Sequence, residues 1–254
     1  MIKLLLIGLT AWSACISAQE NKDGIFHYSS MDAMRNGVYT GNLTVKDVKK
    51  KGDFGLGTYN FLDGELVMLD GSVYRIVSDG SVEIADHKRE IPFGSFTFFK
   101  KEHSEELRNV KTVEELMKNI REILPSSNRF YAIKIEAVFK ELTLGGAIKV
   151  NEEDRTGIAD LMKTRPLYIN QNIKGTLVGF YSPSYVGGLD LSPFHFHFIS
   201  EDRKVGGHLV EGTFAFSKFT VQLDEKNTYE VMLPNNDNKG YRSKWESSGA
   251  NSQY

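Results

Sequence analysis

Short apolar segments separated by polar turns make up most of the chain. In the stretch GLGTYNFLDGELVMLDGSVYRIVSDGSVEIAD, residues 55–86, Asp-Gly interrupts the apolar segments three times, at 63–64, 70–71 and 79–80. Glycine adopts the positive φ that a tight hairpin needs, so Asp-Gly between apolar segments favours β-hairpins. This part of the chain therefore predicts consecutive antiparallel strands.

One amphipathic helix is expected between two further strands, SFTFFK (95–100) and RFYAIKIEAVFKEL (129–142). Thr112 and Glu115 have the spacing of a capping box, and Pro125 ends the pattern. The apolar stripe between them consists of Val113, Leu116, Met117, Ile120 and Leu124. The helix should pack this stripe against a sheet.

The second half of the chain again predicts strands, with a short helix around 158–162 before them. Four segments have the apolar pattern of strands: 175–183, 194–200, 208–225 and 229–234. The pattern as a whole predicts a strand-rich mixed α/β fold. We expect an N-terminal mixed-sheet domain over 19–150, a C-terminal sheet domain over 151–234, and a polar, loosely ordered tail over 235–254.

The first eighteen residues have the pattern of a secretory signal peptide. Lys3 precedes a mostly apolar run over 4–9, which is too short to span a bilayer, and small residues follow. Cys15, the chain's one cysteine, lies in this segment. Lipoprotein anchoring at Cys15 is the alternative, but Trp12 stands where a lipobox normally has leucine. We expect a secreted or periplasmic protein without disulfides and without a membrane span.

Composition and charge narrow the function classes. The chain has 254 residues, 41% of them hydrophobic and 25% charged, with a formal net charge of -2. Nonspecific nucleic-acid binding depends on a basic stripe that displaces counterions, and the sequence has none. A P-loop and a glycine-rich dinucleotide fingerprint are also missing. We therefore expect neither a nucleic-acid partner nor an organic cofactor.

Three of the six histidines lie between residues 195 and 208. His195 and His197 are two apart and so point to the same face of a strand, while Phe194, Phe196 and Phe198 point to the core. A turn at Gly206-Gly207 would bring His208 alongside them. Three imidazoles with an open coordination position are typical of catalytic zinc. The competing interpretation of these three histidines is an ordinary polar strand face. The other three, His27, His87 and His103, have no comparable spacing, and we expect them to be surface residues.

Glu65 offers a second functional group. It directly follows the Asp63-Gly64 turn and begins a strand, from which its carboxyl can extend into a cleft. Acids at such positions are often only solvated, so the spacing alone leaves both interpretations open.

These residues together resemble the α-acetolactate decarboxylase family. The similarity runs from about residue 31 to about residue 234, and its most specific motifs are FGLGTYNFLDGEL (54–66) and the HxHFIxxxRxxGGH pattern from His195 to His208. The resemblance implies zinc bound by His195, His197 and His208, active-site roles for Thr58 and Glu65, and a dimer. It also implies two sheet-based subdomains, with the zinc site in the C-terminal half facing the N-terminal half.

The reaction implied is the conversion of (S)-2-acetolactate, a small 2-hydroxy-3-oxo acid, into (R)-acetoin and carbon dioxide. Decarboxylation leaves a basic, negatively charged enediolate. A Lewis-acidic Zn²⁺ stabilises such charge, and a carboxyl such as Glu65 can deliver the proton.

The sequence departs from the family pattern at two places. Gly145 stands where the family has a substrate-holding arginine, and the nearest downstream arginine, Arg155, has a different setting. The family also has a glutamate from the C-terminal tail near the zinc, for which Glu246 is the remaining candidate. The alternatives are therefore a non-catalytic zinc-binding relative, or a cupin-type metal enzyme with Glu201 as fourth ligand.

Overall fold

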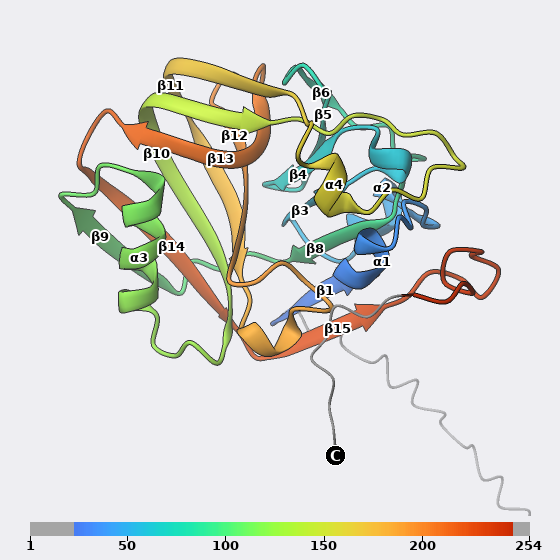
Figure 1. The fold of residues 1–254 in the computed structure, drawn as a ribbon. Coiled ribbons are helices and arrows are strands. Elements are labelled where there is room, and N and C mark those ends of the chain that lie inside the picture. Colours follow the sequence, from blue (N-terminus) through green and yellow to red (C-terminus); the bar gives the residue numbers. More distant parts are fainter. Residues whose placement is uncertain (1–22, 246–254) are drawn as a thin grey trace, which may run out of the picture.

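Two large sheets contain most of the strands of the computed structural model, which describes residues 23–245 (Figure 1). They lie side by side as two lobes, with helix α3 on one and helices α1, α2 and α4 near the other. The helices are α1 (Met31–Arg35), α2 (Val45–Val48), α3 (Val113–Ile123) and α4 (Ile158–Leu161). The strand-rich mixed α/β class is confirmed.

The first sheet has seven strands in the order β15-β1-β8-β3-β4-β5-β6. Consecutive antiparallel pairs run from β3 to β6, as the Asp-Gly turns predict, and Gly64, Gly71 and Gly80 all have positive φ. β1 pairs in parallel with β15, which comes from the far end of the chain. The strands are β1 (Gly24–Tyr28), β3 (Phe54–Thr58), β4 (Glu65–Leu69), β5 (Ser72–Ile76), β6 (Val82–Ile84), β8 (Phe93–Thr97) and β15 (Thr228–Met232); β2 (Leu43–Thr44) and β7 (Glu90–Ile91) form a separate pair.

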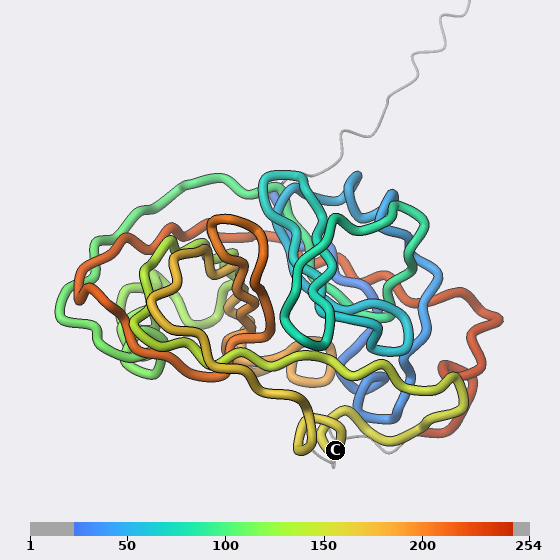
Figure 2. The backbone as a smooth tube through the Cα atoms, turned by 90° about the horizontal axis from the view of Figure 1, so that it is seen from above, coloured from blue at the N-terminus to red at the C-terminus, as the bar shows by residue number. Residues whose placement is uncertain are grey.

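The second sheet has the order β11-β12-β13-β10-β14-β9, and β10 also pairs with β11. Strands β10 to β13 therefore close into a ring, seen from above in Figure 2. Closure is possible because β10 and β11 are long and pair with each other over most of their length. The strands are β9 (His103–Arg108), β10 (Phe130–Gly145), β11 (Leu167–Tyr181), β12 (Phe194–Ser200), β13 (Gly206–Phe214) and β14 (Lys218–Lys226).

Sheet membership does not follow a boundary at residue 150. Strands β9 and β10 precede that residue but belong to the second sheet, and β15 follows it but joins the first. The sheets also share a core, in which Leu56 and Val67 of the first pack with Val178 and Ile199 of the second. This contact holds β12 against β4, and it is what brings the two halves of the site together.

Helix α3 covers the second sheet with the predicted stripe. Thr112 caps it by accepting a hydrogen bond from the Glu115 amide at 3.1 Å. The Glu115 carboxylate accepts from the amide of Lys111 rather than from that of the cap residue, at 2.7 Å. The helix packs Val113, Leu116 and Ile120 into the same core as Phe196 and Phe198.

The described part of the tail, 235–245, contacts the first lobe. The Asn238 side chain donates to the Thr40 carbonyl at 2.8 Å, and the hydroxyls of Tyr241 and Ser29 lie 2.7 Å apart. The predicted signal peptide over 1–18 and Glu246 fall outside the described residues. Within 23–245, no helix is long and apolar enough to cross a membrane.

Candidate metal centre

The three predicted histidines converge on one point between the two sheets. His195 and His197 lie on β12, and His208 on β13 pairs directly with His197. Their ring centroids are 5.0, 5.2 and 5.3 Å apart, and one nitrogen from each lies within 4.8 Å of the others. The connecting turn lies over 201–205, not at the predicted Gly206-Gly207 pair, which already belongs to β13. The glycines instead extend the strand that carries His208.

Hydrogen bonding leaves the imidazoles suited to a cation. The Nδ1 of His197 lies 2.9 Å from the Leu66 carbonyl oxygen, so it carries the proton and donates. Its Nε2, and the Nδ1 of His195, are buried with no hydrogen-bond partner among the described residues. Burial lowers the pKa of His197 to about 4 and holds those of His195 and His208 well below 6.5. Buried, neutral imidazoles with free lone pairs are what a divalent metal requires.

Glu65 faces these histidines from the other sheet. It is the first residue of β4, and its Oε2 lies 3.7 Å from the Nε2 of His197. The side chain is almost fully buried, and this burial raises its pKa to about 8, although the nearby charge of Arg165 acts in the opposite direction. Burial therefore favours the protonated form of Glu65. The interpretation as a solvated surface carboxylate is wrong.

Thr58 lies beside Glu65 because β3 and β4 pair in that register. Its hydroxyl donates to the Gly64 carbonyl at 2.8 Å. Thr58 thereby links the end of β3 to the residue that precedes Glu65.

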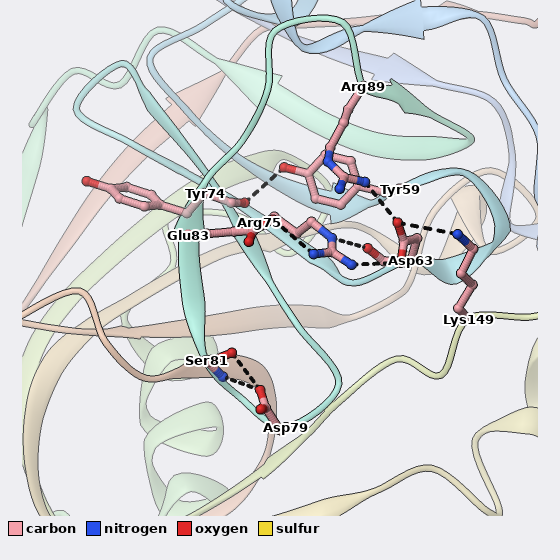
Figure 3. A network of polar contacts seen from close by, with 9 residues as sticks. All are labelled: Tyr59, Asp63, Tyr74, Arg75, Asp79, Ser81, Glu83, Arg89 and Lys149. Carbon is pink, nitrogen blue, oxygen red and sulfur yellow. Dashed lines mark hydrogen bonds and ion pairs between the residues drawn. The ribbon is translucent and has the colours of Figure 1, made fainter.

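A polar network fixes the turn in front of Glu65 (Figure 3). The Asp63 carboxylate accepts from Arg75 at 2.7 Å and from Arg89 at 2.8 Å, and Lys149 lies 3.8 Å away. Arg75 also donates to the Asp63 carbonyl at 2.6 Å. Partial burial opposes ionisation of Asp63, but the two arginines outweigh it and keep its pKa below the ordinary value. The first lobe thus holds the start of β4 in place.

The three histidines, Glu65 and Thr58 line a cavity of about 330 Å³. Its walls are otherwise largely apolar, and they come from both lobes and from α4: Met31, Met34, Leu62, Phe93, Ala147, Ile158, Met162 and Leu191. A cavity of this size fits a small molecule, with the histidines and Glu65 at its polar end.

Arg165, which sequence reasoning missed, also lines this cavity. It precedes β11, at the end of a segment that leaves the second lobe at Gly145, runs along the first lobe and returns (Figure 2). The return is fixed by pairing of Gly145 with Leu167. In the sequence, Arg165 could have been noticed because it lies between Thr164 and Pro166, directly before a strand. Only the β10–β11 pairing, however, shows that it returns to Gly145. Arg155 is exposed, and its guanidinium donates to the carbonyls of Glu152 and Asp154.

Two further expectations are corrected. His27 is fully buried, with its Nδ1 2.8 Å from the Ser95 hydroxyl, so it is no surface residue; His87 and His103 are exposed as expected. Glu201 is exposed and pairs with Lys174, away from the three histidines, so the cupin arrangement has no fourth ligand there. Among the described residues, the histidine triad thus has Glu65 as its neighbouring acid.

The fold and the site define a candidate metalloenzyme acting on a small molecule. Comparisons with known proteins identify its family. The sequence model of the alpha-acetolactate decarboxylase family matches residues 25–244. The alpha-acetolactate decarboxylase of Bacillus subtilis strain 168 is 37% identical over 211 residues, 83% of this chain and 82% of the relative. That of Methanosarcina mazei is 34% identical over 84% of this chain and 73% of the relative.

A solved structure agrees with the sequence comparisons. The crystal structure of alpha-acetolactate decarboxylase from Bacillus subtilis strain 168 superimposes with a TM-score of 0.82 at 35% identity, covering 89% of this chain and 94% of the other. The chain belongs to the alpha-acetolactate decarboxylase family, a family of lyases.

Proposed function

We propose that the protein catalyses the zinc-dependent decarboxylation of (S)-2-acetolactate to (R)-acetoin and carbon dioxide. The observation that carries the proposal is the convergence of three imidazoles, two of them buried and all with lowered pKa values, with the buried Glu65 carboxyl in one small cavity. The identity of the proposed substrate rests on family membership, because the relatives are named for acetolactate.

His195, His197 and His208 would hold the metal. Their unpartnered buried nitrogens fit a cation better than water, since two of them have no polar neighbour within hydrogen-bonding reach in the described part of the chain. A zinc ion bound there supplies Lewis acidity, which stabilises negative charge developing on the substrate oxygens.

Glu65 then provides the proton. The bond between the carboxylate carbon and C2 breaks, carbon dioxide leaves, and the electron pair remains on the C2 side as an enediolate. Glu65 donates its proton to carbon and recovers one from solvent, so that acetolactate and one proton give acetoin and carbon dioxide. Burial raises its pKa and so favours the protonated form that a donor requires. The apolar walls limit competing protonation by water.

The test is an assay of the purified, zinc-loaded protein with racemic 2-acetolactate. We expect acetoin to form, with (R) in excess on a chiral column. A protein that binds zinc and leaves acetolactate unchanged would instead be the non-catalytic zinc-binding relative.

Export and pairing belong to the same proposal. We propose a secreted or periplasmic homodimer, supported by the sequence pattern over 1–18 and by the family resemblance. Fractionation of producing cells tests whether the protein is exported. Light scattering of the purified protein tests whether it is a dimer.

A further inference from the structure

Arg165 brings a positive charge to the cavity, and in the described part of the chain no acidic side chain contacts its guanidinium. Its Nη1 donates a hydrogen bond to the Met162 sulfur at 3.5 Å. Within residues 23–245, no ion pair joins its guanidinium to a carboxylate. By contrast, Arg35, the other arginine that lines the cavity, pairs with Asp32 at 2.9 Å and donates to the Gly187 carbonyl. A partly buried guanidinium without a carboxylate partner is suited to bind an anion.

The position of this guanidinium depends on Gly145. A Cβ atom at residue 145 would lie 2.8 Å from the Nε of Arg165 and 2.9 Å from its Cζ. The guanidinium therefore occupies the space that any side chain at 145 would take. Gly145 has no positive φ, so its backbone does not itself require glycine.

The same register places Arg165 beside the metal ligands. Gly145 pairs with His208 on one side and with Leu167 on the other. The guanidinium that covers Gly145 thus stands next to one histidine of the triad, in the cavity that also contains Glu65.

We propose that Arg165 binds the substrate carboxylate, and that Gly145 is small in order to give its guanidinium room. The inference rests on the proposed function, since it takes a 2-hydroxy-3-oxo acid as the ligand. Two parallel N–H groups of the guanidinium would donate to the two carboxylate oxygens and hold the bond to C2 in one orientation. The negative charge leaves the carboxylate during the reaction, so the contact is strongest in the ground state. Its loss should therefore affect KM more than kcat.

The first experiment compares Arg165→Gln with Arg155→Gln in the zinc-loaded protein. Arg155 is the matched control, because it lies exposed on the same segment. We expect Arg165→Gln to raise KM for acetolactate by about ten- to a hundredfold with a smaller change in kcat, the effect of losing one charge-assisted contact. Zinc content should be unchanged in both variants. Equal KM values for the two variants would overturn the inference.

The second experiment moves the charge. Gly145→Arg alone forces two guanidinium groups into one space and should lower kcat/KM. Adding Arg165→Ala should recover at least part of this loss, because one cation then remains beside His208. If Gly145→Arg keeps the wild-type kcat/KM, Gly145 and Arg165 do not share this space. The same follows if the loss of kcat/KM in the double variant, expressed as a free energy, equals or exceeds the sum of the losses in the two single variants.

A binding measurement separates this inference from the proposed function. The ligand is the substrate analogue whose 3-oxo group is reduced to a hydroxyl, which keeps the carboxylate, and its uncharged methyl ester is the comparison. Calorimetry should show that wild type prefers the acid to the ester and that Arg165→Gln does not. If wild type shows this preference without turning over acetolactate, the proposed function fails and the role of Arg165 stands. If wild type does not prefer the acid, or the variant keeps the preference, the role of Arg165 fails whatever the activity.

Discussion

His197 on β12 and His208 on β13 face each other as a directly paired couple, although ten residues separate them along the chain. The candidate metal site is therefore a product of strand register. Successive strand residues alternate between faces, so a shift of one residue would turn His208 away from the other two histidines. The Phe side chains on the opposite face of β12 hold that register by packing in the core of the second lobe.

The first prediction concerns metal binding. His197→Ala should abolish stoichiometric zinc binding, because two imidazoles and a protonated carboxyl hold zinc far more weakly than three imidazoles. Zinc per chain is measured by mass spectrometry after dialysis, with about one expected in wild type. His103→Ala, on exposed β9, is the control and should keep its zinc. Equal zinc content in the two variants would contradict the assignment.

The second prediction concerns the proton donor. Glu65→Gln keeps the size of the buried side chain but has no acidic proton, so turnover should fall on the order of 10²–10⁴-fold while zinc stays bound. Glu105→Gln, exposed on β9, should behave like wild type. A Glu65→Gln protein with normal kcat would show that the proton comes from elsewhere.

Local sequence patterns predicted the hairpins, the capped helix α3 and the histidine triad, because each depends on residues close together in the chain. They did not predict how β10 and β15 divide between the two sheets, which depends on pairing between distant segments. Arg165 was missed for the same reason. It meets Gly145 only because the segment over 146–166, between β10 and β11, returns to its starting point. His27 was misjudged because polar neighbours in sequence do not show that a strand is buried on both faces.

The third prediction tests the network that positions Glu65. Asp63→Asn removes the charge that Arg75, Arg89 and Lys149 share, leaving three cations around the turn before β4. We expect a loss of about 1–3 kcal/mol in the free energy of unfolding, the usual cost of leaving partly buried polar groups unsatisfied. We also expect a lower kcat with zinc retained, since the turn sets the direction of Glu65. Denaturant titration and steady-state kinetics measure the two effects.

The control for this network is Asp70→Asn. Asp70 occupies the equivalent place in the next turn, but its side chain is 72% exposed. Its replacement should change neither stability nor kcat. Similar losses of stability and kcat in both variants would show that Asp63 is no more important than an exposed acid in the next turn, and would contradict its assigned role.

The last prediction concerns His27 and pH. Burial lowers the pKa of His27, although the nearby Asp190 acts in the opposite direction. The unfolded chain, with an ordinary pKa near 6.5, therefore binds a proton more readily than the folded one, and stability must fall as pH drops below about 6.5. Between pH 7.5 and 5.5, His27 should account for a loss of at most about 1.4 kcal/mol, since one proton over one pH unit contributes that much. The free energy of unfolding at the two pH values, measured by denaturant titration, should differ less in His27→Gln than in wild type. Exposed His87→Gln is the control and should keep the wild-type difference. A His27→Gln protein with the full wild-type pH dependence would show that His27 is protonated as easily in the folded protein as in the unfolded chain.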